Sequence, residues 1–368
     1  MRLVLAGILV GHGLIHIAGF LAAFGLAEVG VLRNDPSRPA GILWLVAAVL
    51  LVASGVLLFA FPARWSQVAV IALVLSQGLI VSSWGDAKFG TLANVVVMFP
   101  VLVALLGQAP WSPRARFARE VSAGSSRVVM PPALLTDGDL APLPGPVREY
   151  LRFAGAVGKP RVVDYKVSFT GGLRSGPNDP WMKATVEQWS THEPSSRRFL
   201  LRARRYGVPF DAFHRYVGGS ATFEVRIASL FPVIDARGAE MDQSETVTLL
   251  NDMAVLAPAT LIDSRIQWEP AGDRIVRAIF TNEGHTVSAT LAFDGTGALV
   301  DFWSDDRYRT VDGRTYEKAR WSTPVATYRE ADGRKVPVHA EARWTVAGTG
   351  FAYARLDVVD IAYNLRVR

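Results

Sequence analysis

The stretch Val163-Asp164-Tyr165-Lys166-Val167-Ser168-Phe169 places an apolar side chain at every second position and a polar one between. Successive side chains of a β-strand point to opposite faces, so this alternation predicts a strand with one buried and one wet face. The same alternation returns in residues 223–227, 287–293 and 338–346. Turn signals separate these stretches: Gly218-Gly219, Glu283-Gly284, Asp294-Gly295, Asp312-Gly313 and Asp332-Gly333. The pattern predicts an antiparallel sheet and not the βαβ units of a nucleotide-binding fold.

One helix interrupts the predicted strands. Asp242 followed by Glu245 has the spacing of a capping box, and an apolar stripe runs from Leu249 through Met253 to Leu256. We therefore expect an α+β domain over 145–368, in which a curved antiparallel sheet forms a half-barrel and one long amphipathic helix lies across its mouth. Such an arrangement often leaves an apolar cavity, which is the most direct route to function. The phase of the last strand slips between Val358 and Val359, which predicts a β-bulge.

The N-terminal part of the chain is of another kind, because the first 110 residues hold only eight charged side chains. These are Arg2, Glu28, Arg33, Asp35, Arg38, Arg64, Asp86 and Lys88. A helix needs roughly 20 apolar residues to cross a bilayer, and four stretches reach or approach that length. They are Leu3–Ala27, Gly41–Phe61, Ser66–Trp84 and Phe89–Gly107. We expect a transmembrane four-helix bundle over 1–109; a cleaved signal peptide is the alternative for the first stretch, which its apolar length disfavours.

Residues 110–144 differ from both parts. Seven of the 21 prolines lie between Pro110 and Pro146, which predicts an extended, semi-rigid linker. Pro146 then suits the first position of a short helix over Val147–Phe153.

The distribution of positive charges predicts the orientation of the chain in the membrane, and the net charge and cysteine content exclude several kinds of site. With four spans, six arginines fall on the side of both termini: Arg2, Arg64, Arg114, Arg116, Arg119 and Arg127. Arg33, Arg38 and Lys88 fall on the other side, so the distribution favours a cytoplasmic C-terminal domain. The net charge of +6 includes no basic tail, so nucleic acid is not expected as a partner. The absence of cysteine excludes disulfides and thiolate metal sites.

Polar residues inside the apolar stretches are candidate functional residues, because they are costly in a bilayer. His12 and His16 lie one helical turn apart, so they could ligate a metal or a haem iron, or hydrogen-bond to Gln77 or Asn94 across the bundle. The second interpretation is favoured.

The hairpin around Asp86 and Lys88 suits an interfacial loop, with a lipid or quinone headgroup site as the alternative. These six residues form the predicted polar seam: His12, His16, Gln77, Asp86, Lys88 and Asn94.

The soluble part shows no phosphate-binding glycine loop, serine elbow or HExxH motif. Glu240 and Asp242 could act as acid and base, although acidic residues at a helix start also stabilise its dipole. The run Arg197, Arg198, Arg202, Arg204 and Arg205 could bind anionic headgroups, but its alternation with Leu201 and Ala203 favours a solvated strand face.

Several longer strings add a resemblance. They are Gly13-Leu-Ile-His16, Asp86-Ala-Lys-Phe-Gly-Thr91 with Asn94, Leu143-Pro-Gly-Pro-Val147, Trp181-Met182 with Glu187-Gln188, Phe231-Pro-Val-Ile-Asp-Ala-Arg-Gly238 and Glu240-Met-Asp-Gln243. Together they resemble an uncharacterised family of bacterial proteins with four N-terminal transmembrane helices and a β-rich C-terminal domain. The resemblance implies a multi-pass protein of the bacterial cytoplasmic membrane and brings no activity with it. In general shape, such a domain is similar to the curved sheets of lipoprotein carriers.

These observations lead to one functional hypothesis and two alternatives. The leading hypothesis is a membrane-anchored module that binds a membrane lipid or another apolar small ligand, with no assigned reaction. Candidate ligand-binding residues are Trp181, Glu187, Glu240, Asp242 and Met253. The alternatives are an enzyme acting on a membrane-derived small molecule through Glu240 and Asp242, and a haem or redox protein using His12 and His16. No cofactor is expected, with haem a minor possibility, and nothing in the sequence indicates the oligomeric state.

Overall fold

The computed structural model describes residues 2–30, 32, 35–126 and 130–366. The chain divides into two compact units, Met1–Ala109 and Pro110–Arg368, which are described separately below. Arg33 and Arg127, which contribute to the predicted charge distribution, lie outside the described residues.

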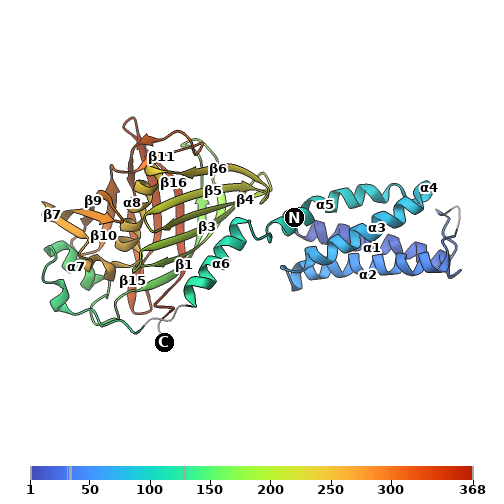
Figure 1. Cartoon of the computed structure of the whole chain (residues 1–368), viewed down its shortest axis with the longest axis horizontal. Helices are drawn as coiled ribbons and strands as arrows, with labels where there is room; N and C mark the ends of the chain where they lie inside the picture. The colour runs from blue at the N-terminus through green and yellow to red at the C-terminus, as the bar shows by residue number, and fades with distance from the viewer. Residues whose placement is uncertain (1, 31, 33–34, 127–129, 367–368) are drawn as a thin grey trace. The chain divides into compact units, whose positions relative to one another are not determined.

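The first unit is helical (Figure 1). Its helices are α1 (Arg2–Ala23), α2 (Arg38–Ala60), α3 (Trp65–Ser82), the short α4 (Trp84–Ala87) and α5 (Gly90–Leu106). Among the described residues, α1, α2 and α3 are long and apolar enough to cross a membrane. Helix α5 is equally apolar but has 17 residues, at the lower limit for a span. The prediction of apolar N-terminal helices is confirmed, and α5 as a fourth span stays a prediction.

Small residues bring α1 and α2 into close contact. A Cβ atom added to Gly13 would lie 2.9 Å from the carbonyl oxygen of Ala48, and one added to Gly19 would lie 2.4 Å from the ring of Trp44. Helices in an apolar medium gain little from hydrophobic burial, so close backbone approach at small residues is a main source of their association. The glycines of the Gly13–Gly19 stretch therefore have a packing role.

The second unit is built on one large antiparallel sheet. Fourteen strands form it within the described residues, in the order β6-β5-β4-β3-β2-β1-β16-β15-β13-β10-β9-β8-β7, with β14 also paired to β15. The strands are β1 (Asp164–Leu173), β2 (Met182–Thr191), β3 (Ser196–Arg205), β4 (Val208–Val217), β5 (Ser220–Ile227), β6 (Phe231–Arg237), β7 (Ile266–Gly272), β8 (Ile275–Asn282), β9 (His285–Phe293), β10 (Leu299–Ser304), β13 (Arg320–Ser322), β14 (Val325–Ala331), β15 (Arg334–Val346) and β16 (Thr349–Tyr363). The two-residue strands β11 (Tyr308–Arg309) and β12 (Glu317–Lys318) pair with each other.

Helices flank this sheet. They are α6 (Pro113–Ser125), the 3-10 turn η1 (Asp137–Leu140), α7 (Gly145–Phe153), α8 (Ala239–Val255) and the 3-10 turn η2 (Pro258–Ile262). Helix α7 confirms the predicted short helix, and it buries Val147, Tyr150 and Leu151. The Tyr150 hydroxyl donates a 2.6 Å hydrogen bond to the carbonyl of Ala254, which ties α7 to the end of α8.

The sheet curls around α8, as Figure 1 shows. Helix α8 packs against β5 and β6 near one end of the strand order and against β9 and β10 near the other. The Tyr216 hydroxyl on β4 accepts a 2.9 Å hydrogen bond from the Asn282 amide on β8, so strands far apart in the order meet at this point. Two strands at opposite ends of a flat sheet could not touch, so this contact confirms the predicted half-barrel.

Helix α8 is buried on all sides, in contrast to the predicted amphipathic stripe. Its buried residues are Met241 and every residue from Ser244 through Val255. Ser244, Thr246 and Thr248 each donate to the carbonyl four residues earlier, which satisfies their hydroxyls without water. The predicted capping box is wrong, because the helix begins at Ala239 after Gly238, and Asp242 instead accepts a 2.6 Å bond from the backbone N–H of Ala221.

The extended linker predicted for 110–144 is wrong for residues 113–125, which form α6. Ser112 caps this helix and Pro113 occupies its first turn, a combination that favours helix initiation. Phe117 packs edge-on against Phe213, and Glu120 accepts 2.9 Å bonds from Arg198 and Arg215. Helix α6 therefore docks on the outer face of β3 and β4, the face turned away from α8.

The sequence pattern also determines local features of the sheet. Ser168 pairs with Asp360 and Phe169 with Val358, so Val359 is left over and the predicted bulge is confirmed. The five predicted turns all connect consecutive strands. At Asp332-Gly333 both residues have positive φ, as a two-residue hairpin turn requires.

Candidate functional site

A cavity of about 820 Å³ lies between α8 and the inner face of the sheet. Its volume falls within the roughly 300–1,000 Å³ of typical small-molecule sites. Strand alternation supplies the wall, since Phe199 and Leu201 of β3 point inward while Arg198 and Arg202 point outward. Most of the wall is apolar: Phe169, Leu173, Met182, Phe199, Leu201, Phe210, Phe223, Val225, Ile227, Ile234, Trp321, Trp344, Tyr353, Leu356 and Val358.

One end of this apolar wall continues onto an exposed surface. Tyr206, Val208, Ile227 and Val233 line the cavity and are exposed, and Phe231 lies beside Ile227 in the next strand. Tyr206 is 87% exposed and Phe231 64%. We call these five residues the apolar rim: Tyr206, Val208, Ile227, Phe231 and Val233.

A buried charged cluster lies where α8 meets the cavity. We call it the cavity floor, and it consists of Arg197, His214, Glu245, Asp252 and Arg307. Arg197, on β3, donates from Nε to Asp252 at 2.8 Å and from Nη1 to Glu245 at 3.3 Å. Asp252 also accepts a 2.6 Å bond from the Gln188 amide. Since Arg197 is 5% exposed, the solvated strand face predicted for this arginine is wrong.

Glu245 is the centre of the cavity floor and is fully buried. One carboxylate oxygen, Oε1, lies 3.1 Å from His214 Nε2 and 3.5 Å from Arg307 Nη2, and it accepts a 3.0 Å bond from Thr248. The other oxygen, Oε2, faces Arg197. Burying a carboxylate is expensive unless cations and hydrogen bonds surround it, and here they do.

Electrostatics set the protonation states of these groups. Burial opposes ionisation of Glu245, but His214 in its protonated form, Arg197 and Arg307 outweigh it and hold the pKa of the carboxyl below its ordinary value. Burial raises the pKa of Asp252, against the attraction of Arg197. Burial, reinforced by repulsion from the two arginines and opposed by Glu245, lowers the pKa of His214 to about 4. His214 is therefore neutral at pH 7.

The structure separates the five predicted ligand-binding residues, and none of them lines this cavity. Trp181 lies under the guanidinium groups of Arg174 and Arg355, while its neighbour Met182 lines the cavity. Glu240 lies in the first turn of α8, Asp242 is bonded to Ala221, and Met253 packs in the hydrophobic core. Neither Glu240 nor Asp242 lines the cavity, so their role as acid and base stays a prediction.

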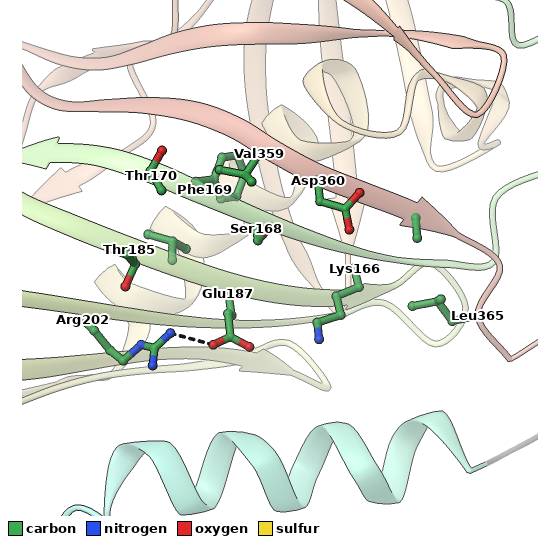
Figure 2. Close-up of a pocket in the computed structure, with 12 residues that line it drawn as sticks. Lys166, Ser168, Phe169, Thr170, Thr185, Glu187, Arg202, Val359, Asp360 and Leu365 are labelled. Carbon is green, nitrogen blue, oxygen red and sulfur yellow. Dashed lines mark hydrogen bonds and ion pairs between the residues drawn. The ribbon is translucent and has the colours of Figure 1, made fainter. Parts of the chain in front are cut away.

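Glu187 points to the other face of the sheet, into a smaller groove (Figure 2). There it forms a 2.8 Å ion pair with Arg202 of β3, and Lys166 and Asp360 line the same groove. Both side chains of the Glu187–Arg202 pair are more than a third exposed, so this ion pair is partly solvated.

The predicted polar seam comes together only in part. His12 Nε2 lies 3.0 Å from Asn94 Oδ1 and 3.2 Å from Ser76 Oγ, and Asn94 donates a 2.9 Å bond to Gln77. We call His12, Ser76, Gln77 and Asn94 the histidine network, and it confirms the hydrogen bonding predicted for His12. Ligation of haem iron through His12 Nε2 would require breaking its contacts with Asn94 and Ser76.

His16, another member of the predicted seam, contacts this network, because its ring centre lies 4.6 Å from that of His12. His16 is buried, and its Nδ1 lies 3.0 Å from the carbonyl oxygen of His12. Asp86 lies in α4, and the Lys88 ammonium lies 5.5 Å from the centre of the Phe89 ring.

Comparison with known families matches residues 133–356 to a family of unknown function, DUF6544. The chain belongs to the DUF6544 family. The match covers most of the curved sheet, α7, α8 and all five residues of the cavity floor. None of the curated proteins matches the chain.

Solved structures show distant similarity to the DUF6544 domain. A putative outer membrane lipoprotein-sorting protein domain from Vibrio parahaemolyticus has 10% identity and a TM-score of 0.33, with 54% of this chain and 85% of that chain covered. A LolA superfamily protein from Nitrosomonas europaea has 11% identity and a TM-score of 0.33, covering 59% and 93%. A DUF1329 family protein from Desulfovibrio piger has 10% identity and a TM-score of 0.27, covering 60% and 92%.

Sequence reasoning missed the cavity floor because its members are distant in the chain. His214 stood alone among scattered histidines, and Glu245 was assigned to helix capping. One signal was present: Arg197, Phe199 and Leu201 share a strand face, so a charged residue continues an apolar row. A buried arginine needs an acidic partner. The carboxylates of the long helix in the predicted domain were therefore candidate ion-pair partners for Arg197.

Proposed function

We propose that the DUF6544 domain binds a lipid or another ligand with an apolar body in the cavity between α8 and the sheet, as the ligand-binding module of a membrane-anchored protein. The observation that carries this proposal is a cavity of about 820 Å³ with a wall of aromatic and aliphatic side chains. A closed core would fill such a volume, since interiors are packed as densely as organic crystals.

The apolar rim supports the same proposal. Soluble surfaces rarely expose contiguous large apolar side chains without a binding role. Here Tyr206, Val208, Ile227 and Val233 belong both to the surface and to the cavity wall. A hydrocarbon chain could pass along this continuous apolar surface without exposing its length to water.

Three apolar helices of spanning length on the same chain supply the anchor in this proposal. An anchor keeps the domain at a surface where lipids are concentrated, so even weak intrinsic affinity suffices for loading.

Photocrosslinking tests the proposal on the full chain. The protein is reconstituted in phosphatidylcholine nanodiscs that contain a small fraction of monoacylglycerol with a diazirine in its acyl chain. After irradiation, we expect labelled peptides from the inner face of β3 and β5, around Phe199, Leu201 and Phe223.

Two variants with the same substitution sharpen this test. Ala342 lines the cavity, whereas Ala362 lies on the outer face of the same sheet, in the groove of Figure 2. Ala342→Trp should reduce labelling of β3 and β5 several-fold, and Ala362→Trp should leave it unchanged, with circular dichroism reporting the fold of both. Labelling confined to residues 1–109, or equal in the two variants, would contradict the proposal.

A further inference from the structure

We propose that the ligand of this cavity is an acidic amphiphile, whose headgroup binds Arg307 at the cavity floor while its hydrocarbon body lies along the apolar wall. This inference rests on the proposed function and narrows it to a chemical class. It comes from Arg307, two of whose buried N–H groups have no hydrogen-bond partner among the described residues.

Arg307 is a buried cation held in a fixed position. It follows β10, immediately precedes β11 and is 8% exposed. Its guanidinium carbon lies 4.0 Å from the ring centre of Trp321 and 5.5 Å from that of Trp344. Cation–π contacts of this kind position a guanidinium without using its N–H donors.

Those donors lack partners on the protein. Among the described residues, neither Nε nor Nη1 of Arg307 has a hydrogen-bond partner, although both atoms are buried. Only Nη2 approaches a carboxylate, at 3.5 Å from Glu245 Oε1. Leaving a buried donor without an acceptor is costly, and the cost is larger for a charged group.

Glu245 cannot supply the missing acceptor. Its Oε1 already accepts from Thr248 and faces His214, and its Oε2 faces Arg197. Asp252 is likewise engaged by Arg197 and Gln188. The two carboxylates of the cavity floor are therefore engaged by other groups, and Arg307, which lines the cavity, keeps two donors without a partner among the described residues.

The charge of the cavity lining also favours an acidic headgroup. Five arginines line it, namely Arg174, Arg197, Arg205, Arg307 and Arg309, against three carboxylates, Glu245, Asp252 and Glu341. A carboxylate or phosphate headgroup would accept from Arg307 and offset this excess. The adjoining wall of Phe199, Leu201 and Phe223 suits a hydrocarbon chain, so one molecule would satisfy both parts of the cavity.

Three diazirine probes with the same acyl chain test this inference in phosphatidylcholine nanodiscs at pH 8. They are a neutral monoacylglycerol, a fatty acid with a carboxylate headgroup, and a lysophosphatidic acid with a phosphate headgroup. With the unmodified full chain, we expect the acidic probes to label β3 and β5 at concentrations on the order of tenfold lower than the neutral probe, because charge-assisted bonds are strong. The ratio between the two acidic probes identifies the headgroup.

Arg307→Gln provides the decisive variant, with Arg320→Gln as the control. Arg320 is an exposed arginine paired with Asp305 at 2.8 Å outside the cavity. Arg307→Gln should remove the tenfold preference for acidic probes and keep labelling by the neutral probe, which also reports that the variant is folded. Arg320→Gln should keep the preference.

The outcomes separate this inference from the proposed function. No labelling of β3 and β5 by any probe overturns both. Labelling by all three probes at equal concentrations overturns the acidic headgroup alone. A preference that survives Arg307→Gln, or neutral labelling lost together with acidic labelling, overturns the assignment to Arg307.

Discussion

The histidine network of the helical unit and the cavity floor of the sheet unit are both polar clusters in apolar surroundings, but they are built from different groups. The histidine network joins an imidazole, a hydroxyl and two amides through bonds of 2.9–3.2 Å. The cavity floor joins two guanidiniums, two carboxylates and an imidazole. Neutral groups can close a network by pairing with one another, whereas buried charges need compensation in number and in geometry.

The difference between the two clusters indicates which of them can bind a ligand. Every member of the histidine network is hydrogen-bonded to another member, so a ligand would have to displace an existing bond. In the cavity floor, Arg307 keeps unused donors next to an open volume. The charged cluster is thus the one in which a ligand could add bonds without breaking any.

The largest expected effect follows from removing the centre of the cavity floor. Glu245→Ala leaves Arg197 paired with Asp252 alone and removes the carboxylate that faces Arg307, so we expect the free energy of unfolding of the sheet unit to fall by about 3–5 kcal/mol. Urea unfolding followed by tryptophan fluorescence measures this. A loss below about 1 kcal/mol, as for an exposed ion pair, would show that the cluster is not desolvated as described.

A smaller effect is expected from pH. His214 faces Glu245, Arg197 and Arg307, and its folded pKa of about 4 lies below its ordinary value of 6.5. Protons therefore bind the unfolded chain more readily, so the stabilisation is fully present above pH 6.5 and is lost as the pH falls toward 4. Between pH 7 and pH 5 we expect a loss of about 2 kcal/mol.

His214→Gln checks the source of this pH dependence. Glutamine does not titrate. The urea unfolding midpoint of the His214→Gln variant should therefore change little between pH 7 and pH 5, while the midpoint of the unmodified chain falls. Equal slopes in the two proteins would assign the pH dependence to other groups.

The smallest effect is expected in the helical unit. Asn94→Ala removes bonds to His12, Ser76 and Gln77, yet we expect a loss of only about 1 kcal/mol, because interhelical hydrogen bonds in membranes are individually weak. Unfolding of the full chain by sodium dodecyl sulfate, with Ser54→Ala as control, measures this. Among the described residues, Ser54 bonds within its own helix alone, to the carbonyl of Leu50. A loss for Asn94→Ala as large as the loss for Glu245→Ala would remove the contrast between the two clusters.

Particular residues show how far sequence could reach. Alternation and turn residues are local, so the sheet, the bulge at Val359 and α7 could be predicted. Helix α6 was missed because the prolines around it indicated extended chain, although Ser112-Pro113 is itself a helix start. Of the site, His12 and Asn94 could be anticipated, since any polar group within an apolar span needs a partner. Glu245 could not be assigned, because at a helix start an acidic residue has a sufficient local explanation.

The sequence by itself determined the division into an apolar helical unit and an antiparallel sheet, because charge density and side-chain period are properties of consecutive residues. Only the tertiary structure decided which face of the sheet surrounds the cavity and which charges meet there. Arg197 and Arg202 look alike in the sequence, yet one is buried against Glu245 and the other pairs with Glu187 on the outer face. Curling of the sheet around α8 makes that distinction, and it depends on contacts between residues as distant as Tyr216 and Asn282.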